Sequence, residues 1–247
     1  MDLVIDVGNT QVKYAVFNND SKLIISQSKS HLQFLNQLHY IFEAYSNIER
    51  SIISASGKMN HKWLKLLKTK TNCLVFTQET PIPIQNSYKS KQTLGLDRIA
   101  LAVAACYNYP NKNCLVVDLG TCITYDFIRN DGVYFGGAIS PGLAMRFKAM
   151  HNFTEKLPLI NQMGEIPKEF IGQTTEDALK VGVYHAVLHE IEGFRKQYLV
   201  DYEDLTLVLT GGNAQVLADR LKNSIFANLN FQLFGLHQIL IYNSNAH

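Results

Sequence analysis

The sequence carries little net charge and has no long apolar run, and each shortage excludes a class of protein. Its 23 basic and 21 acidic side chains leave a formal charge of +2 over 247 residues. That balance provides no basic field for nucleic acid or for an anionic membrane surface. No stretch reaches the roughly 18 apolar residues of a membrane-spanning helix. We therefore expect a small-molecule partner, no nucleic acid and no membrane.

Cysteine is also scarce, and its spacing excludes further classes. No C-x-x-C pair occurs among the four cysteines, which are Cys73, Cys106, Cys114 and Cys122. This spacing argues against a zinc site or a disulfide framework. The first residues include Asp2 and Asp6 and lack the basic start and unbroken apolar run of a signal peptide. These features predict a cytoplasmic protein.

Short apolar runs alternate with amphipathic helical segments along the chain, and 47% of the residues are hydrophobic. This composition excludes a disordered chain, and the alternation is typical of the α/β class. One unit occurs twice. Residues 3–17 form an apolar run, a turn that begins at Asp6 and a second apolar run, and residues 114–128 repeat this order around Asp118. The repeat predicts two strand-turn-strand hairpins.

The same repeat predicts the domain organisation. We expect two similar lobes, at residues 1–112 and 113–247, with the boundary near Pro110. One Asp-x-Gly turn alone is best explained as an ordinary hairpin, but two facing copies can hold the phosphates of a nucleotide, because glycine lets an anion approach backbone N–H groups closely. A third turn, at residues 210–213, has two explanations. It could contact the base or ribose of a nucleotide, or it could be only the start of a helix.

The helical pattern predicts where the longer elements lie. The longest helix is expected from Thr175 to about Tyr198, with Thr174 or Thr175 as its N-cap, because two acidic residues follow. A shorter helix is expected from Leu96 to Tyr107. At the C-terminus, the apolar positions within residues 227–247 predict one or two closing strands.

Six short motifs follow one another along the chain. They are Asp6-x-Gly8-Asn9-Thr10, Gly95-x-Asp97-Arg98, Asp118-x-Gly120-Thr121, Gly136-Gly137-x-x-x-Pro141-Gly142, Gly172-x-x-Thr175 and Thr210-Gly211-Gly212. This ordered set, spanning residues 1 to about 213, resembles the type III pantothenate kinases of the acetate and sugar kinase, heat-shock chaperone and actin superfamily. The resemblance implies an α/β fold of two similar lobes of ribonuclease H-like (actin-like ATPase) type, with a nucleotide cleft between them.

The resemblance also implies an activity, the ATP-dependent phosphorylation of pantothenate to 4'-phosphopantothenate, which is the first step of coenzyme A biosynthesis. It implies that ATP contacts Asp6, Val7, Gly8, Asn9, Thr10, Gln11, Val12, Lys13 and Thr121. Magnesium would be held through Asp6 at the phosphate site, and a monovalent cation, potassium or ammonium, would be held by Asp118. Because the relatives are dimers, the resemblance also implies a homodimer.

For pantothenate the resemblance implies contacts with Tyr88, Gly95, Leu96, Asp97, Arg98 and Thr175. Asp97 would be the general base, and Arg98 would pair with the pantothenate carboxylate. Thr174 could take the place of Thr175, and the segment around Tyr88 is variable among relatives. Read from the pattern alone, Asp97 and Arg98 are better explained as an exposed helix start, with the aspartate capping the helix.

Two other functions fit parts of the sequence. A non-catalytic regulator could keep the same fold, although the carboxylates at Asp6, Asp97 and Asp118 argue against it because a binding protein needs no base. A kinase for a sugar or another small alcohol is the second alternative. Arg98 argues against a neutral sugar, since a guanidinium suits a carboxylate.

Overall fold

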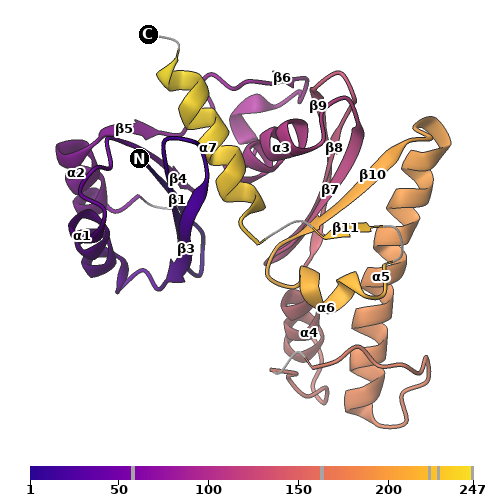
Figure 1. Ribbon diagram of the computed structural model, residues 1–247. Coiled ribbons are helices and arrows are strands. Elements are labelled where there is room, and N and C mark those ends of the chain that lie inside the picture. Colours follow the sequence, from indigo (N-terminus) through magenta and orange to yellow (C-terminus); the bar gives the residue numbers. More distant parts are fainter. Residues whose placement is uncertain (57–58, 162–163, 222–223, 227–228, 246–247) are drawn as a thin grey trace. The chain divides into compact units, whose positions relative to one another are not determined.

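In the computed structural model the described residues are 1–56, 59–161, 164–221, 224–226 and 229–245, and the chain divides into two compact units (Figure 1). Unit 1 comprises Met1–Asn108 and Asn230–His247, and unit 2 comprises Tyr109–Leu229. The sequence assigned the whole of 113–247 to the second lobe, whereas the final segment makes its contacts with unit 1. The chain therefore leaves unit 1 once and returns to it at the end.

Unit 1 is built on a mixed sheet with the strand order β3-β2-β1-β4-β5. Its strands are β1 (Asp2–Val7), β2 (Val12–Phe17), β3 (Leu23–Lys29), β4 (Arg50–Ala55) and β5 (Asn72–Val75). Strand β1 pairs antiparallel with β2 and parallel with β4. The first predicted hairpin is therefore confirmed, and it occupies the middle of the sheet.

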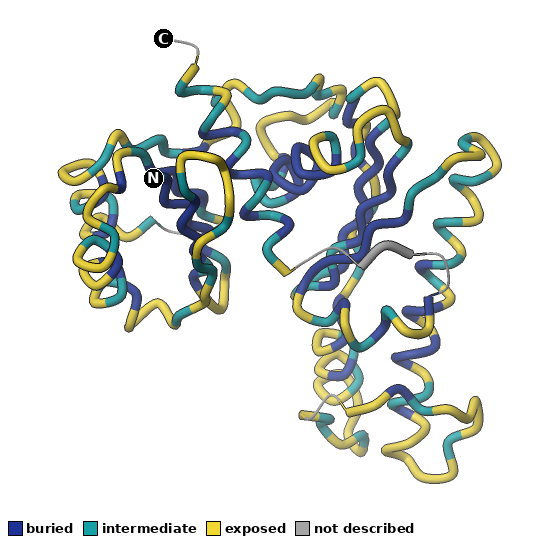
Figure 2. Tube along the Cα trace, in the orientation of Figure 1, coloured by how far each residue is buried: buried dark blue, intermediate teal, exposed yellow. Residues whose placement is uncertain are grey.

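Helices cover this sheet and bury its central strands. They are α1 (Phe34–Ala44), α2 (His61–Lys70), α3 (Leu96–Asn108) and α7 (Phe231–Ser244); short pieces β6 (Gln85–Asn86) and a 3₁₀ turn (Lys91–Thr93) precede α3. Side chains of α1 and α2, among them Phe34 and Trp63, form a core with one face of β1 and β2. Helix α7 contacts α3, β1, β2 and β4. Strand β1 is buried along its length and β4 in its middle, as the dark blue of these strands shows in Figure 2.

Unit 2 repeats the arrangement. Within this unit the strands of the sheet lie in the order β11-β10-β7-β8-β9. They are β7 (Asn113–Leu119), β8 (Cys122–Ile128), β9 (Val133–Pro141), β10 (Leu205–Thr210) and β11 (Ser224–Phe226). Strand β7 pairs antiparallel with β8 and parallel with β10, as β1 does with β2 and β4. Helices α4 (Leu143–Asn152) and α5 (Thr175–Asp201) pack with this sheet, and the short α6 (Ala214–Ala218) follows β10. The second predicted hairpin is confirmed.

The N-cap of α5 is Thr174, which settles the choice between the two threonines. The Oγ1 of Thr174 accepts a hydrogen bond of 3.1 Å from the backbone N–H of Asp177. Thr175 is then the first helical residue, and its side chain is exposed. A capping hydroxyl satisfies one of the N–H groups that a helix start leaves without an intrahelical partner.

The closing strands predicted within 227–247 are wrong for the described part of that stretch, where the chain forms α7. Residues around the whole helix are buried, including Leu233, Leu236, His237 and Leu240. In a helix that is apolar on all sides, polar and apolar residues do not alternate with the helical repeat of 3.6 residues. Such a helix therefore cannot be recognised from the periodicity of its sequence. Among the described residues, no helix is long and apolar enough to span a membrane.

Candidate functional site

The turn between β1 and β2 places a carboxylate beside a polar loop. Asp6 lies one residue before the end of β1 and is 8% exposed. The following Asn9, Thr10 and Gln11 are exposed, so their donors face solvent. The N–H of Gly8 donates to the carbonyl of Gln11 at 3.1 Å, which closes the turn. The arrangement presents short polar groups and main chain to an anion, with the carboxylate set behind them.

The other residues of the predicted ATP-binding segment, Val7, Val12 and Lys13, are buried or half-buried. Val7 and Val12 are 2% and 0% exposed and belong to the core, so that only their main chain could reach a ligand. Lys13 is half-buried and pairs with Asp6 across the antiparallel ladder. On the other side of the turn, His31 Nε2 donates to the carbonyl of Gly8 at 3.0 Å. The sequence analysis did not identify His31, because its contact joins segments that are distant in sequence.

The N-terminus of α3 brings together four predicted substrate residues. Leu96 and Asp97 begin the helix, and Asp97 Oδ1 accepts a hydrogen bond of 2.9 Å from the N–H of Arg98. A Cβ on Gly95 would lie 2.3 Å from that carboxylate oxygen, so the glycine leaves room for Asp97 in this conformation. The Cζ of Arg98 lies 5.7 Å from the ring centre of Tyr88, at a distance typical of a cation–π contact.

Arg98 is 5% exposed, so the explanation of this segment as an exposed helix start is wrong for the arginine. Removing a guanidinium from water costs free energy unless polar or anionic partners compensate for it. The structure thus places a buried guanidinium next to the predicted base Asp97 and the ring of Tyr88.

In unit 2, the turn between β7 and β8 carries the second aspartate. Asp118 lies at the corresponding place in β7 and is half-buried. Gly211 packs against it: this glycine has φ +93°, and a Cβ there would lie 2.2 Å from Asp118 Oδ1. The N–H and side-chain amide of Asn213 both donate to the carbonyl of Leu119, at 3.1 and 3.2 Å. The 210–213 turn and the Asp118 turn thus form one cluster of main chain around a carboxylate.

Thr121 lies at the tip of this second turn and is exposed. Gly142, the N-cap of α4, lies against its other side. The N–H of Gly142 donates to the carbonyl of Thr121 at 3.2 Å, and a Cβ on Gly142 would lie 2.4 Å from that oxygen. Two of the glycine motifs found in the sequence, at Gly142 and Gly211, therefore support the same short turn.

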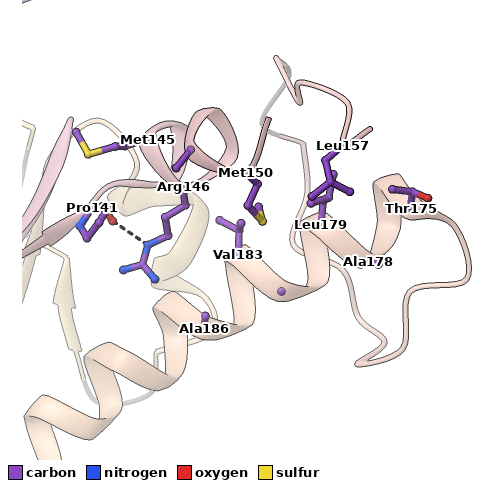
Figure 3. A pocket seen from close by; sticks show the side chains of 12 residues that line it. Pro141, Met145, Arg146, Met150, Leu157, Thr175, Ala178, Leu179, Val183 and Ala186 are labelled. Atoms are coloured by element: carbon purple, nitrogen blue, oxygen red, sulfur yellow. Dashed lines mark hydrogen bonds between the residues drawn. The ribbon is translucent and has the colours of Figure 1, made fainter. Parts of the chain in front are cut away.

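Thr175 is not part of either cluster in unit 2 and lies instead at the start of α5. It borders a pocket of about 660 Å³ that the sequence analysis missed (Figure 3). The lining comes from β9, α4, α5 and the segment between the helices, and consists of Pro141, Met145, Arg146, Ala149, Met150, Leu157, Thr175, Ala178, Leu179, Gly182, Val183 and Ala186. No local signal in the sequence reveals this pocket, because its lining comes from segments that lie apart along the chain.

Metal ligands are sparse in the described part of the chain, where no group of three or more His, Cys, Asp or Glu side chains could hold a metal ion. A magnesium ion is usually bound by one or two carboxylates together with substrate phosphates. Asp6, buried at the end of β1, fits that requirement. The carboxylate of Asp118, surrounded by main chain, provides hard oxygen ligands of the kind that a monovalent cation takes.

Comparison with known proteins decides the family. The model of the type III pantothenate kinase family matches residues 2–197. The chain belongs to the type III pantothenate kinase family. The matched range includes Asp6, Asp97, Asp118 and Thr175, while Gly211 lies beyond it. The recognition from sequence motifs is confirmed.

Curated type III pantothenate kinases match over almost the whole chain. The protein of Christiangramia forsetii is 44% identical over 243 residues, covering 98% of this chain and 99% of its own. That of Flavobacterium psychrophilum is 39% identical over 242 residues, covering 98% and 99%. Members of this family are kinases, so the chain is an enzyme that uses ATP as its phosphoryl donor.

Solved structures support the fold. A protein named for the Baf family of transcriptional activators, from Campylobacter jejuni, is 24% identical with a TM-score of 0.64, covering 98% of this chain and 99% of that one. A protein described as an N-acetylmannosamine kinase, from Listeria monocytogenes, is 13% identical with a TM-score of 0.55, covering 99% of each. The expected α/β fold of actin-like ATPase type, shared with sugar kinases, is confirmed.

Proposed function

We propose that this enzyme transfers a phosphoryl group from ATP to the primary hydroxyl of pantothenate, with Asp97 as the general base. The observation that carries the proposal is the buried Arg98 next to Asp97 at the start of α3. Pantothenate has a carboxylate and a primary hydroxyl, so its recognition requires a cation and its phosphorylation requires a proton acceptor. Both groups are supplied by adjacent residues.

Asp97 accepts the hydroxyl proton as the hydroxyl oxygen bonds to the γ-phosphorus of ATP, while the bond from that phosphorus to the bridging oxygen breaks and ADP leaves. Phosphoryl transfer passes through a loose transition state, so the enzyme mainly positions the reactants and balances charge. A correctly placed base contributes a factor of roughly 10² to 10⁴. Arg98 makes charge-assisted hydrogen bonds with the carboxylate of pantothenate and so orients the substrate. Gly95, Leu96, Tyr88 and the exposed hydroxyl of Thr175 complete the pantothenate contacts in this proposal.

The nucleotide contacts are assigned to the two Asp-x-Gly turns. The main chain and side chains of 6–13 bind the phosphates, and Thr121 contacts the nucleotide from the second turn. Asp6 holds magnesium, which when bound neutralises charge on the phosphates. Asp118 holds potassium or ammonium. The main-chain cluster around its carboxylate keeps these oxygens in place before the ion binds.

The same proposal makes the enzyme a cytoplasmic homodimer. Cys73, Cys106, Cys114 and Cys122 are free thiols in the structure, which suits a reducing compartment. Sedimentation of the purified enzyme tests the dimer, with a mass of twice 27.9 kDa as the expected result.

The general base is tested by Asp97→Asn, which keeps the side-chain shape and removes the basic oxygen. Formation of ADP with pantothenate, magnesium and potassium is measured, together with thermal unfolding. We expect turnover to fall by at least roughly 10² while unfolding is unchanged. The matched control is Asp20→Asn, an exposed aspartate of the same unit, which should behave as the wild type. Turnover like the wild type in Asp97→Asn would remove Asp97 from the role of base.

The substrate is tested by a panel of pantothenate, pantetheine and common sugars with the wild-type enzyme. Pantetheine keeps the hydroxyl of pantothenate but replaces its carboxylate with an amide. If Arg98 binds the carboxylate, pantothenate is the preferred acceptor, and Arg98→Lys reduces that preference. Equal rates with a neutral sugar would contradict the proposal, and ADP formation without any acceptor would favour a different role.

A further inference from the structure

Arg146 is the centre of a hydrogen-bond network, and this arginine lies outside all six motifs. It lies on α4 and lines the pocket described above (Figure 3). Its Nε donates to the carbonyl of Pro141 at 2.8 Å, and its Nη2 donates to Ser140 Oγ at 2.8 Å. The same Nη2 donates to Glu190 Oε2 at 2.6 Å. The planar guanidinium thus joins the end of β9 to helix α5.

Glu190 is fixed in turn by a second donor. The hydroxyl of Tyr125, on β8, donates to Glu190 Oε1 at 2.7 Å. The Tyr125 ring is fully buried, and the Phe194 ring lies 4.2 Å away, centre to centre. Burial and the neighbouring carboxylate raise the pKa of Tyr125 far above its usual value, so the phenol keeps the proton that it donates. Burial alone raises the pKa of Glu190, but the hydrogen bonds from Arg146, Tyr125 and Ser140 outweigh it and keep this carboxylate ionised.

The part of β9 held by Arg146 is the part that supports the Thr121 turn. Pro141 is the register partner of Cys122, directly after Thr121. The next residue, Gly142, donates to the carbonyl of Thr121 and has no room for a Cβ above this turn. A shift of Pro141 would therefore be transmitted to the Thr121 main chain through one peptide unit.

We propose that Arg146, held by Glu190 and Tyr125, is a positioning residue that sets the Thr121 turn for nucleotide binding. The inference rests on the proposed function, in which Thr121 contacts ATP. Arg146 itself touches no reactant in this role. Its hydrogen bonds are directed at protein atoms of β9 and α5, and the other side chains that line the pocket are apolar except for Thr175.

The network explains why an arginine is needed at this position. A lysine could keep the ion pair with Glu190, but one ammonium cannot reproduce the planar fork that reaches Pro141, Ser140 and Glu190 together. If Arg146 only stabilised the fold through its charge, lysine would be an adequate replacement. If Arg146 positions the Thr121 turn through Pro141, the Arg146→Lys variant should bind nucleotide more weakly although it keeps the positive charge.

The test compares Arg146→Lys, Arg146→Met and Tyr125→Phe with the wild type. The affinity for ATP with magnesium is measured by titration calorimetry without any acceptor, and KM values for ATP and for pantothenate are measured separately. We expect the Kd and KM for ATP to rise about tenfold in both Arg146 variants, and less in Tyr125→Phe, with KM for pantothenate changed by less than about twofold. Arg129→Met is the control, because the Arg129 guanidinium lies at the surface, where it pairs with Asp131 and lies 4.9 Å from the centre of the Phe135 ring.

Three outcomes would overturn the proposal. These are wild-type ATP affinity in a folded Arg146→Lys, equal rises in the two KM values, or the same loss in Arg129→Met. Should Arg146→Met not fold, Arg146→Lys and Tyr125→Phe decide the matter. Calorimetry measures ATP binding without turnover. Its result therefore tests the role of Arg146 whether or not the enzyme phosphorylates pantothenate. A wild-type enzyme that binds ATP but does not phosphorylate pantothenate would contradict the function, and the variants would still report on the turn.

Discussion

The carboxylate of Asp118 lies directly against the main chain of Gly211, so closely that a Cβ on the glycine would come within 2.2 Å of Oδ1 and 2.6 Å of the Leu119 nitrogen. Gly211 also has φ +93°, a conformation that other L-residues adopt only with strain. The next residue, Gly212, has neither restriction, because no atom lies within 4 Å of its Cβ position. Gly212 can therefore serve as the control for a substitution at Gly211.

Gly211→Ala is expected to damage the enzyme and Gly212→Ala to leave it nearly unchanged. The methyl group at 211 must displace Asp118 or the β7 main chain, which adds to about 1–2 kcal/mol of backbone strain. Urea unfolding and the potassium dependence of ADP formation measure the two effects. We expect Gly211→Ala to lose stability and to need more potassium. Equal behaviour of the two variants would show that the contact with Asp118 is unimportant.

A second prediction concerns the buried charges that attach α7 to the sheet of unit 1. Asp2 on β1 is 2% exposed and accepts hydrogen bonds from Arg50 Nη2 at 2.6 Å and from His237 Nε2 at 2.8 Å. The His237 ring stacks on Phe17 with 4.0 Å between ring centres. Burial alone raises the pKa of Asp2, but the hydrogen bonds from His237 and Arg50 outweigh it and hold that pKa below its usual value.

The sign of the pH effect follows from this lowered pKa. A carboxyl group that is more acidic in the folded state stabilises the fold above its unfolded pKa of about 3.9. This contribution is lost as the pH falls below about 4 and through the folded value. Asp2→Asn should therefore destabilise the fold by about 1–3 kcal/mol at pH 7, because it leaves the buried His237 and the partly buried Arg50 without their anion. Its stability should also fall less between pH 4 and 2 than that of the wild type.

Urea unfolding at pH 7 and at several values below pH 4 checks this prediction. Asp20→Asn serves as the control, since Asp20 is exposed in the turn between β2 and β3. The control should follow the wild-type pH curve. An Asp2→Asn curve parallel to the wild type would mean that other groups cause the acid sensitivity.

A third prediction concerns His31, which donates to the carbonyl of Gly8 at 3.0 Å in the turn that we propose binds the phosphates of ATP. Its ring stacks on Trp63 with 6.0 Å between centres. His31→Ala frees the Gly8 peptide, and we expect KM for ATP to rise several-fold with little change in KM for pantothenate. His39→Ala, an exposed histidine of α1, is the matched control. A rise confined to pantothenate would place His31 in a different role.

Local patterns in the sequence were sufficient for much of the fold. The two hairpins, the start of α3 at Leu96 and the start of α5 at Thr175 follow from turn chemistry, apolar runs and capping residues, which act over a few positions. The family could be recognised for a related reason, since its motifs are short and ordered. Helix α7 could not be predicted, because burial on all sides removed its period.

The sequence by itself determined the α/β class, the two Asp-x-Gly hairpins and the family, because each depends on neighbouring residues. Only the tertiary structure decided that Arg98 is buried, that Gly211 packs on Asp118 and that Arg146 bonds to Glu190 of another helix. These relationships join segments far apart along the chain. Their physical basis is close packing, in which the space left by one segment determines what another can place there, and no local pattern carries that information.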